Sequence, residues 1–385
     1  MFEGIFQMLF QNSLILYVFL SAIATSFLIL LTKPLHIRFT AKGHTTLARQ
    51  SSHSNPTPRV GGLSILLGCI VGVLLLAGQD TKHIAILLGV SSLPVFLGGL
   101  GEDIGFAVST YIRLGLSFVS ALCAGLFFNF WIPRLGIPGL EIVTSYLIVS
   151  ALLTILVSAG ISHAFNLIDG LNGLAIGISL LTGLGLGGIA HSVGDYTLSS
   201  ICWVLVASLA GILVFNFPFG KIFLGDAGAY SLGHIFVWIG ILILNRNPEV
   251  QPFAILLIFF WPTSEMLFSI YRRYKSNRPI DQPDRLHYHQ LVMRAVELVF
   301  LSRRHRKLTN PLATFIILPL AAAPVVTAFF IWPNNKNAIF AFIFYFIVFA
   351  ASYFLGLLLA KRYAKNPSQK FADLAFSAFR KRNSM

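Results

Sequence analysis

The sequence predicts an all-α membrane protein, a polytopic bundle of about 11 transmembrane helices. Of the 385 residues, 56% are hydrophobic and 11% are charged, whereas a soluble domain carries about 25% charged residues. Apolar runs of about 18 residues or more recur from one end of the chain to the other, and runs of this length can cross a bilayer. These observations exclude a water-soluble protein of several domains.

The expected spans follow the apolar runs in order. They cover residues 13–32, 61–78, 83–101, 113–131, 144–163, 173–190, 196–216, 228–245, 250–271, 311–332 and 338–360. The N-terminal Met1-Phe-Glu-Gly has an acidic residue and no basic one before its apolar run, so we expect a retained first span rather than a cleaved signal peptide. We expect residues 1–361 to form a single integral-membrane domain, followed by a basic cytoplasmic tail at 362–385.

The distribution of Lys and Arg predicts the orientation. All of these residues except Lys82, Arg134, Arg246 and Lys336 fall in alternate loops and in the C-terminal tail. The positive-inside rule places loops rich in Lys and Arg in the cytoplasm. We therefore expect a periplasmic N-terminus and a cytoplasmic C-terminus. Topology also explains the formal net charge of +14 without nucleic acid, for which the sequence has no base-stacking or groove-reading motif.

The same orientation gathers acidic residues from distant loops at one face of the membrane. These are Glu102 and Asp103 after the third span, Asp169 after the fifth, Asp226 after the seventh, and Asp281 and Asp284 after the ninth. The positive-inside rule does not require this, because acidic residues contribute little to it. An acidic turn residue or a helix cap explains one such loop but explains four less well. We therefore predict an active site at the cytoplasmic face.

The loop from His163 to Gly173 places Asn166, Asp169 and Asn172 between two apolar runs. Asn166 and Asp169 have the i, i+3 spacing that points two side chains the same way on a helix. An ionised carboxylate beside hydrocarbon is costly and marks a candidate functional site. The alternative is a polar turn in which Asn172 caps the following helix.

Two further loops suggest a divalent cation. Glu102 and Asp103 would repel each other near one site unless a cation were present, although a solvated helix end is the simpler alternative. Asp226 lies between Gly225 and Gly228 immediately before a span. A small number of oxygen ligands suits Mg²⁺, which keeps waters and borrows phosphate oxygens from its substrate. The alternative for Asp226 is an N-cap.

Basic and imidazole side chains of the same loops are candidates for binding phosphate groups. They are His53, Arg59, Lys221, Arg285, His287 and His289. The segment from 284 to 289 has no Cys and no third close ligand, which argues against zinc. The alternative for the basic first loop is attraction to anionic lipid headgroups. Glu265, after Pro262, is expected to face an aqueous cleft because a proline can bend a membrane helix.

Five of these motifs, in this order, resemble those of the polyprenyl-phosphate N-acetylhexosamine-1-phosphate transferase family, over residues 13 to 300. They are Pro-Thr-Pro-Arg-x-Gly-Gly at 56–62, the acid pair at 102–103, Phe-Asn-Leu-Ile-Asp-Gly-Leu-Asn-Gly-Leu at 165–174, Phe-Leu-Gly-Asp-Ala-Gly at 223–228 and Asp-Arg-x-His-x-His at 284–289. The segment from Tyr271 to Ala295 is more similar to the bacterial UDP-GlcNAc:undecaprenyl-phosphate branch than to the muramoyl-pentapeptide branch. The chain departs from the family at Glu102, where Asp is usual, at Ala229, where Ser is usual, and at Thr45-Thr-Leu-Ala48, where Asp-x-Pro-Asn is often found.

The resemblance implies Mg²⁺-dependent transfer of a sugar-1-phosphate from a UDP-N-acetylhexosamine, with UDP-GlcNAc the first choice, to undecaprenyl phosphate, releasing UMP. Mn²⁺ is the alternative metal. The reaction would take place at the cytoplasmic face of the bacterial inner membrane, as the first membrane step toward a surface polysaccharide such as lipopolysaccharide O-antigen. The expected partners are the two substrates and membrane lipid, without nucleic acid. A homodimer is possible on this reading.

The resemblance also suggests roles for individual residues. Asp226 and Asn166 are expected to bind the metal. Glu102, Asp103 and Asp169 are expected to be catalytic, with Asp103 either a metal partner or the base. Asp169 and Asn172 are expected to orient the nucleotide sugar, and the diphosphate is expected to be held by Arg285, His287 and His289. The alternative function is a secondary transporter or lipid-carrier flippase with acidic ion sites. Transporter sites lie near the bilayer midplane, whereas these acids lie at span ends, and no internal repeat is evident.

Overall fold

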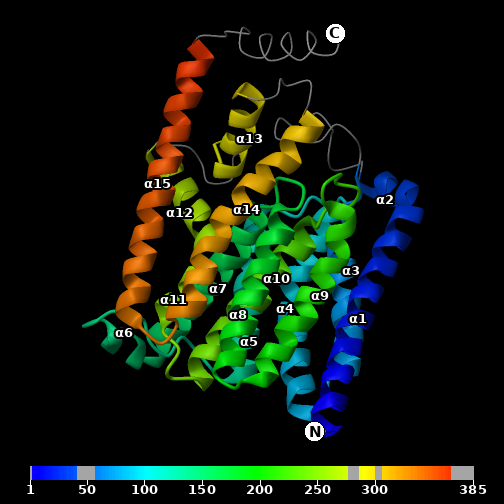
Figure 1. The fold of residues 1–385 in the computed structure, drawn as a ribbon, viewed down its shortest axis with the longest axis vertical. Coiled ribbons are helices and arrows are strands. Elements are labelled where there is room, and N and C mark those ends of the chain that lie inside the picture. The colour runs from blue at the N-terminus through cyan, green and yellow to red at the C-terminus, as the bar shows by residue number, and fades with distance from the viewer. Residues whose placement is uncertain (1, 41–56, 276–285, 300–305, 366–385) are drawn as a thin grey trace.

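The structure is a computed structural model, and it describes residues 2–40, 57–275, 286–299 and 306–365. Every regular element in these ranges is a helix (Figure 1). The helices are α1 (Phe2–Leu31), α2 (Lys33–Thr40), α3 (Gly62–Leu75), α4 (Gln79–Asp103), α5 (Thr110–Phe128), α6 (Glu141–Ser145), α7 (Leu147–Leu167), α8 (Leu174–Ser192), α9 (Tyr196–Asn216), α10 (Gly225–Arg246), α11 (Pro252–Ile258), α12 (Phe260–Lys275), α13 (Tyr288–Val299), α14 (Arg306–Ile331) and α15 (Asn335–Lys365). The all-α prediction is confirmed.

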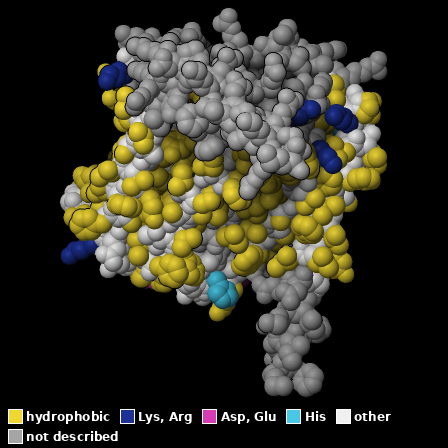
Figure 2. All heavy atoms as spheres, turned by 45° about the horizontal axis from the view of Figure 1, so that its top comes forward, with side chains coloured by type: hydrophobic (Ala, Val, Ile, Leu, Met, Phe, Trp, Pro, Cys, Tyr) yellow, Lys and Arg dark blue, Asp and Glu magenta, His cyan; other side chains and the backbone are white. Residues whose placement is uncertain are grey.

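Within the described residues, 9 helices are long and apolar enough to cross a membrane. Hydrophobic side chains cover most of the described surface on the face seen in Figure 2, as expected for a surface in contact with lipid. Two of the expected spans differ from single full-length helices. The span at 61–78 is the 14-residue helix α3, and the span at 250–271 is the pair α11 and α12, bent by 80°. The count of 11 and the orientation therefore stay predictions.

Helix α10 is the central element of the bundle. Its apolar window is 94% buried inside the protein, whereas that of α15 is 17% buried. Close packing around α10 depends on small residues, as is usual where membrane helices meet. A Cβ added at Gly99 of α4 would lie 2.5 Å from the backbone nitrogen of Ala227, and one added at Gly62 of α3 would lie 2.6 Å from that of Gly228. The first turn of α10 is thus held directly against the backbones of two other helices.

Buried asparagines join the connections at the same end of the bundle. Asn216, at the end of α9, accepts a hydrogen bond from the backbone of Gly173 (2.5 Å) and donates one to the carbonyl of Ile222 (2.7 Å). The side chain of Asn172 donates to the carbonyl of Pro218 (2.8 Å), and its backbone N–H donates to the side chain of Asn310 (2.8 Å). Since backbone polar groups away from water need partners, these side chains keep the loops before α8 and α10 in place.

At the opposite end of the bundle, Arg134 satisfies backbone carbonyls in the last turn of α10 and in the segment that follows it. Its guanidinium donates to the carbonyls of Leu244 (2.9 Å), Pro248 (2.9 Å) and Val250 (2.6 Å). A helix leaves its last carbonyls without intrahelical partners, and a fixed cation is favourable at the negative end of the helix dipole. The sequence identified Arg134 only as a basic residue of a non-cytoplasmic loop.

We expect Arg134→Met to destabilise the fold by about 2 kcal/mol, because several carbonyls lose a charged donor. The apparent Tm of the purified protein in detergent should fall by a few degrees. Lys82→Met is the control, since Lys82 donates to a single carbonyl through a solvent-exposed hydrogen bond. An equal apparent Tm for Arg134→Met and the native protein would show that Arg134 does not hold this end of α10.

Candidate active site

The site is built on the start of α10. Gly225 has a positive φ of 79°, and a Cβ at this position would lie 1.8 Å from the carbonyl oxygen of Arg59. Only glycine combines that conformation with so close an approach. The turn leaves the backbone N–H groups of Asp226 and Ala227 at the helix N-terminus without intrahelical acceptors.

Asp103, the last residue of α4, supplies those acceptors. One carboxylate oxygen accepts from the backbone N–H of Asp226 and the other from that of Ala227, each at 2.9 Å. The residue is fully buried. A carboxylate at a helix N-terminus is favoured both by the hydrogen bonds and by the helix dipole. Asp103 therefore holds the start of α10 in place and with it the side chain of Asp226.

Asp226 is the point at which four distant segments meet. Nη2 of Arg59 lies 3.1 Å from its Oδ1, and the guanidinium of Arg113 in α5 forms a second ion pair with its Oδ2. The side-chain amide of Asn166, near the end of α7, donates to Oδ1 at 3.0 Å. Asp226 is 5% exposed, so two cations and an amide surround a carboxylate that is nearly sealed from solvent. Three of the predicted site residues, Arg59, Asn166 and Asp226, are thus in contact.

Arg113 is the member of the site that sequence reasoning missed. Its guanidinium lies 6.0 Å from the ring centre of Tyr230, one turn along α10 from Asp226. The ring of His163 meets the same tyrosine edge-on at 4.8 Å, and Ser117 Oγ lies 3.3 Å from the Nε2 of that histidine. The available signal was an arginine placed just inside an apolar run, next to the loop after the acid pair. The topology rule explained it as one of many basic loop residues.

Asp169 belongs to the same electrostatic cluster. It is half-buried and lies in the connection between α7 and α8. Burial raises the pKa of the Asp169 carboxyl to about 6, opposed by the charge of Arg59 and reinforced by that of Asp226. A carboxyl with such a pKa is partly protonated at mildly acidic pH and can accept or release a proton near neutrality.

Glu102 separates from its neighbour, as expected for adjacent helical residues, which point about 100° apart. Asp103 faces α10, whereas the half-buried Glu102 acts through its charge on Arg59 and Arg113. The acid pair therefore does not act as two equivalent ligands. One member organises the backbone of α10, and the other adds negative charge beside the arginines.

The two histidines reach the site through Glu265 of α12. Glu265 accepts from the backbone N–H of His289 at 3.0 Å and lies 3.2 Å from its Nδ1, while Nδ1 of His287 is 3.7 Å away. A carboxylate bound to one ring nitrogen sets the orientation and tautomer of a histidine. A Cβ at Gly170 would lie 2.5 Å from Nε2 of His289, so the ring is packed on the loop that carries Asp169.

The expectation that Pro262 turns Glu265 toward an aqueous cleft is wrong. Glu265 is 2% exposed and bonds to His289. The break between the two helices lies at Phe259, ahead of the proline. The reason is local, because a carboxylate in the bundle needs a hydrogen-bonding partner and the start of α13 supplies one.

Other predicted site residues lie apart from Asp226. The Asn172 side chain bonds to Pro218, as described above, and so supports the loop before α10. Lys221 is exposed on that loop. His53 and Arg285 lie outside the described residues. The structure thus brings together Arg59, Glu102, Asp103, Asn166, Asp169 and Asp226. His289 adjoins this group at Gly170, and the ring of His287 stacks on that of His289 with ring centres 5.5 Å apart.

The donors around Asp226 suit a metal that shares its coordination with a substrate. Across the described ranges there is no group of three or more His, Cys, Asp or Glu side chains placed to hold a metal by themselves. Asp226 offers a carboxylate and Asn166 an amide oxygen. Mg²⁺ is typically bound by one or two carboxylates, waters and substrate phosphates rather than by an all-protein cage. The residues therefore fit Mg²⁺ bound together with a diphosphate.

Comparisons with known proteins identify the family of this chain. The model of Glycosyl transferase family 4 matches residues 84–244. A probable undecaprenyl-phosphate N-acetylglucosaminyl 1-phosphate transferase of Bacillus subtilis is 32% identical over 246 residues, which are 63% of this chain and 67% of the relative. The undecaprenyl-phosphate alpha-N-acetylglucosaminyl 1-phosphate transferase of Yersinia pestis is 28% identical over 285 residues, 70% of this chain and 72% of the relative.

The enzyme of the same description from Escherichia coli strain K12 is 28% identical over 280 residues, 70% of this chain and 71% of the relative. The matched family segment carries the acid pair, the loop between α7 and α8, and the start of α10. The chain therefore belongs to the polyprenyl-phosphate N-acetylhexosamine-1-phosphate transferase family and is a phosphoglycosyltransferase of the membrane.

Proposed function

We propose that this enzyme transfers N-acetylglucosamine-1-phosphate from UDP-GlcNAc to undecaprenyl phosphate and releases UMP. A phosphate oxygen of the lipid attacks the β-phosphorus of the nucleotide sugar. The new P–O bond forms as the bond from that phosphorus to the bridging oxygen breaks, and the bridging oxygen leaves with UMP. The observation that carries the proposal is the convergence on Asp226 of Arg59, Arg113 and Asn166 from three other segments.

This reaction brings two anions together, so its main obstacle is electrostatic repulsion. Mg²⁺ bound with the diphosphate would neutralise part of the charge that develops on the transferring group. Arg59 and Arg113, held in place beside Asp226, would add positive charge next to the substrate phosphates. His289, fixed by Glu265, adds a hydrogen-bond donor from the other side of the loop that carries Asp169.

Asp103 and Asp169 take different roles in this proposal. Both oxygens of Asp103 are engaged by backbone N–H groups, which supports a positioning role for Asp103 rather than a role as base. Asp169 is the better proton acceptor, because its pKa of about 6 is close to that of a phosphate monoester. We assign it the proton of the lipid phosphate.

We further propose that the site lies at the cytoplasmic face of the bacterial inner membrane. The Lys and Arg distribution supports this orientation. The product would be undecaprenyl-diphosphate-GlcNAc, the lipid-linked start of a cell-surface polysaccharide such as O-antigen. Mn²⁺ is the alternative metal, and the proposal is compatible with a monomer or a homodimer. Because the acids lie at helix ends rather than at the bilayer midplane, a transporter mechanism is disfavoured.

The reaction is tested with purified enzyme in detergent, without any membrane gradient. We expect UDP-GlcNAc, undecaprenyl phosphate and Mg²⁺ to give UMP and lipid-linked GlcNAc in equal amounts. A panel of other UDP-N-acetylhexosamines should give less lipid-linked product. Turnover that needs no divalent metal would contradict the metal role, and a preference for another sugar would contradict only the choice of substrate.

Asp226→Asn should lower turnover by about 10²-fold or more, because the neutral amide no longer holds two arginines or binds a metal with the same strength. The same substitution at Asp195 is the control. Asp195 is also buried and forms an ion pair with an arginine, Arg246, at 2.8 Å. It caps the start of α9, whereas the loop toward Asp226 follows the end of that helix. Near-native UMP release by Asp226→Asn would remove Asp226 from the reaction.

The raised pKa of Asp169 also predicts a pH-dependent stability in metal-free enzyme. A carboxyl with a folded pKa of about 6 and an unfolded pKa of about 3.9 binds its proton more tightly in the folded state. Its contribution to stability is therefore present below pH 4 and is lost as the pH rises through about 6. The Tm of Asp169→Asn minus that of the native protein should increase between pH 5 and 7.5.

The exposed Asp80 provides the matched control for this measurement, through Asp80→Asn. That substitution makes the same change in formal charge away from the site. If the Tm difference for Asp169→Asn does not change with pH over this range, the carboxyl of Asp169 does not titrate there.

A further inference from the structure

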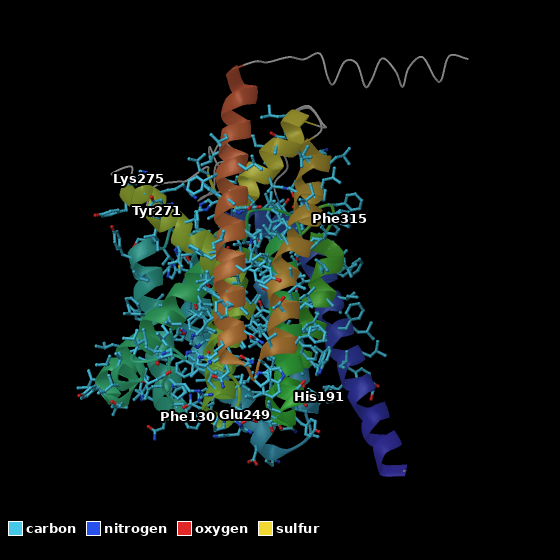
Figure 3. The ribbon with its side chains drawn as sticks, turned by 60° about the vertical axis from the view of Figure 1, so that its left-hand side comes forward. Phe130, His191, Glu249, Tyr271, Lys275 and Phe315 are labelled. Atoms are coloured by element: carbon cyan, nitrogen blue, oxygen red, sulfur yellow. The ribbon has the colours of Figure 1, made fainter. Side chains whose placement is uncertain are left out.

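We propose that a notch between α12 and α15 binds the phosphate group of an anionic glycerophospholipid. The notch is a cavity of about 150 Å³. Its walls are Phe268, Tyr271, Arg272 and Lys275 of α12 and Tyr353, Phe354 and Leu357 of α15. Tyr271 and Lys275 lie at the end of the molecule opposite Phe130, His191 and Glu249 (Figure 3). None of the residues around Asp226 lines the notch, so this is a separate site.

The charge of the notch matches an anion. Its charged residues are Arg272 and Lys275, and none of the described residues that line it is acidic. The Arg272 guanidinium lies 5.3 Å from the ring centre of Tyr353. That ring is 2% exposed, and its hydroxyl donates to the carbonyl of Leu286 at 2.9 Å. A guanidinium stacked on a fixed aromatic ring keeps a geometry suited to phosphate.

The notch is apolar below its cations. Phe268 packs on Tyr353 with ring centres 5.4 Å apart and on Phe354 at 6.3 Å. Phe354 is half exposed, so it presents hydrocarbon to the surrounding lipid. Along α12 the order is apolar Phe268 first and Lys275 last. A ligand with a hydrocarbon chain beneath a negative headgroup follows the same order.

The volume indicates a headgroup rather than a nucleotide. Pockets for drug-sized molecules measure about 300–1,000 Å³, and a water molecule takes about 30 Å³. A cavity of about 150 Å³ therefore has room for a phosphate and little more. Basic pockets between membrane helices on the cytoplasmic side are typical sites for anionic lipid headgroups. The assignment of this cavity to the cytoplasmic leaflet depends on the proposed orientation. Lipid binding in the cavity does not depend on the proposed reaction.

Glycerophospholipid is favoured over undecaprenyl phosphate because of where the notch lies. A reacting phosphate must reach Asp226, and the notch shares no lining residue with the Asp226 cluster. The two regions are joined through α12, whose Glu265 holds His289 one turn before Phe268. An anionic lipid in the notch would therefore brace the helix that orients the histidines.

The test is retention of phosphatidylglycerol against phosphatidylcholine by the full-length protein in mixed detergent micelles, measured by native mass spectrometry. We expect the native protein to retain phosphatidylglycerol preferentially. Each lost cation should reduce that retention by about fivefold, as expected for one Lys or Arg near an anionic lipid surface. Lys275→Gln and Arg272→Gln test the two cations. Because Lys275 is exposed, we do not expect Lys275→Gln to disturb folding, so its loss of retention would report on lipid binding.

Two further variants separate the notch from general surface charge. Arg273→Gln removes the same charge from a neighbour that does not line the cavity, and it should retain phosphatidylglycerol at the native level. Leu357→Trp keeps both cations but fills the cavity, and it should lose retention. Equal losses in Arg273→Gln and Lys275→Gln, or native retention in Leu357→Trp, would overturn the proposal.

A competition experiment tests the source of the phosphate. An excess of undecaprenyl phosphate should leave bound phosphatidylglycerol in place, and displacement would overturn its assignment as a separate phospholipid site. UMP release is measured in parallel with native enzyme. Lipid retention is measured without turnover. Absence of UMP release would therefore contradict the proposed reaction alone, and absence of preferential phosphatidylglycerol retention would contradict the proposed lipid site alone.

Discussion

The interaction between Asp103 and the first turn of α10 is the constraint on which the site depends. A helix that starts inside a protein leaves N–H groups that must find acceptors, and here one buried carboxylate accepts from two of them. Gly225 makes the contact sterically possible, and Gly99 and Gly62 let α4 and α3 approach the same turn. Asp226 can therefore project from a rigid helix start rather than from a mobile loop, which is what a phosphoryl-transfer site requires.

Charge balance explains the composition of the cluster around that turn. Burial of several carboxylates would raise the pKa values of all of them and favour their neutral forms. Asp226 forms ion pairs with Arg59 and Arg113, while burial raises the pKa of Asp169 to about 6. One set of side chains thus provides both a carboxylate that is paired with two cations and a carboxyl that can exchange a proton near neutral pH. The two functions need different environments, and the fold supplies them within one cluster.

Much of the fold and part of the site could be predicted from the chain alone. Composition and the length of apolar runs predicted a helical membrane bundle, because each span must satisfy its own backbone hydrogen bonds in lipid. The expected spans correspond to described helices or to the broken pair α11 and α12. Short motifs identified Arg59, Asn166 and Asp226, since their loops combine charge with glycine beside hydrocarbon. Arg113 escaped because a single arginine at the start of a span has no local pattern that separates it from its basic neighbours.

The sequence by itself determined that the chain is an all-helical membrane protein, which acids lie at span ends, and which family it resembles. Those features follow from local periodicity, charge and motif order. Only the tertiary structure decided that Asp103 caps α10 while Glu102 does not, that Arg113 joins Asp226, and that Glu265 is buried against His289. These facts depend on the rotation of each helix and on the packing of residues up to 124 positions apart, and helical periodicity predicts neither the rotation nor the neighbour.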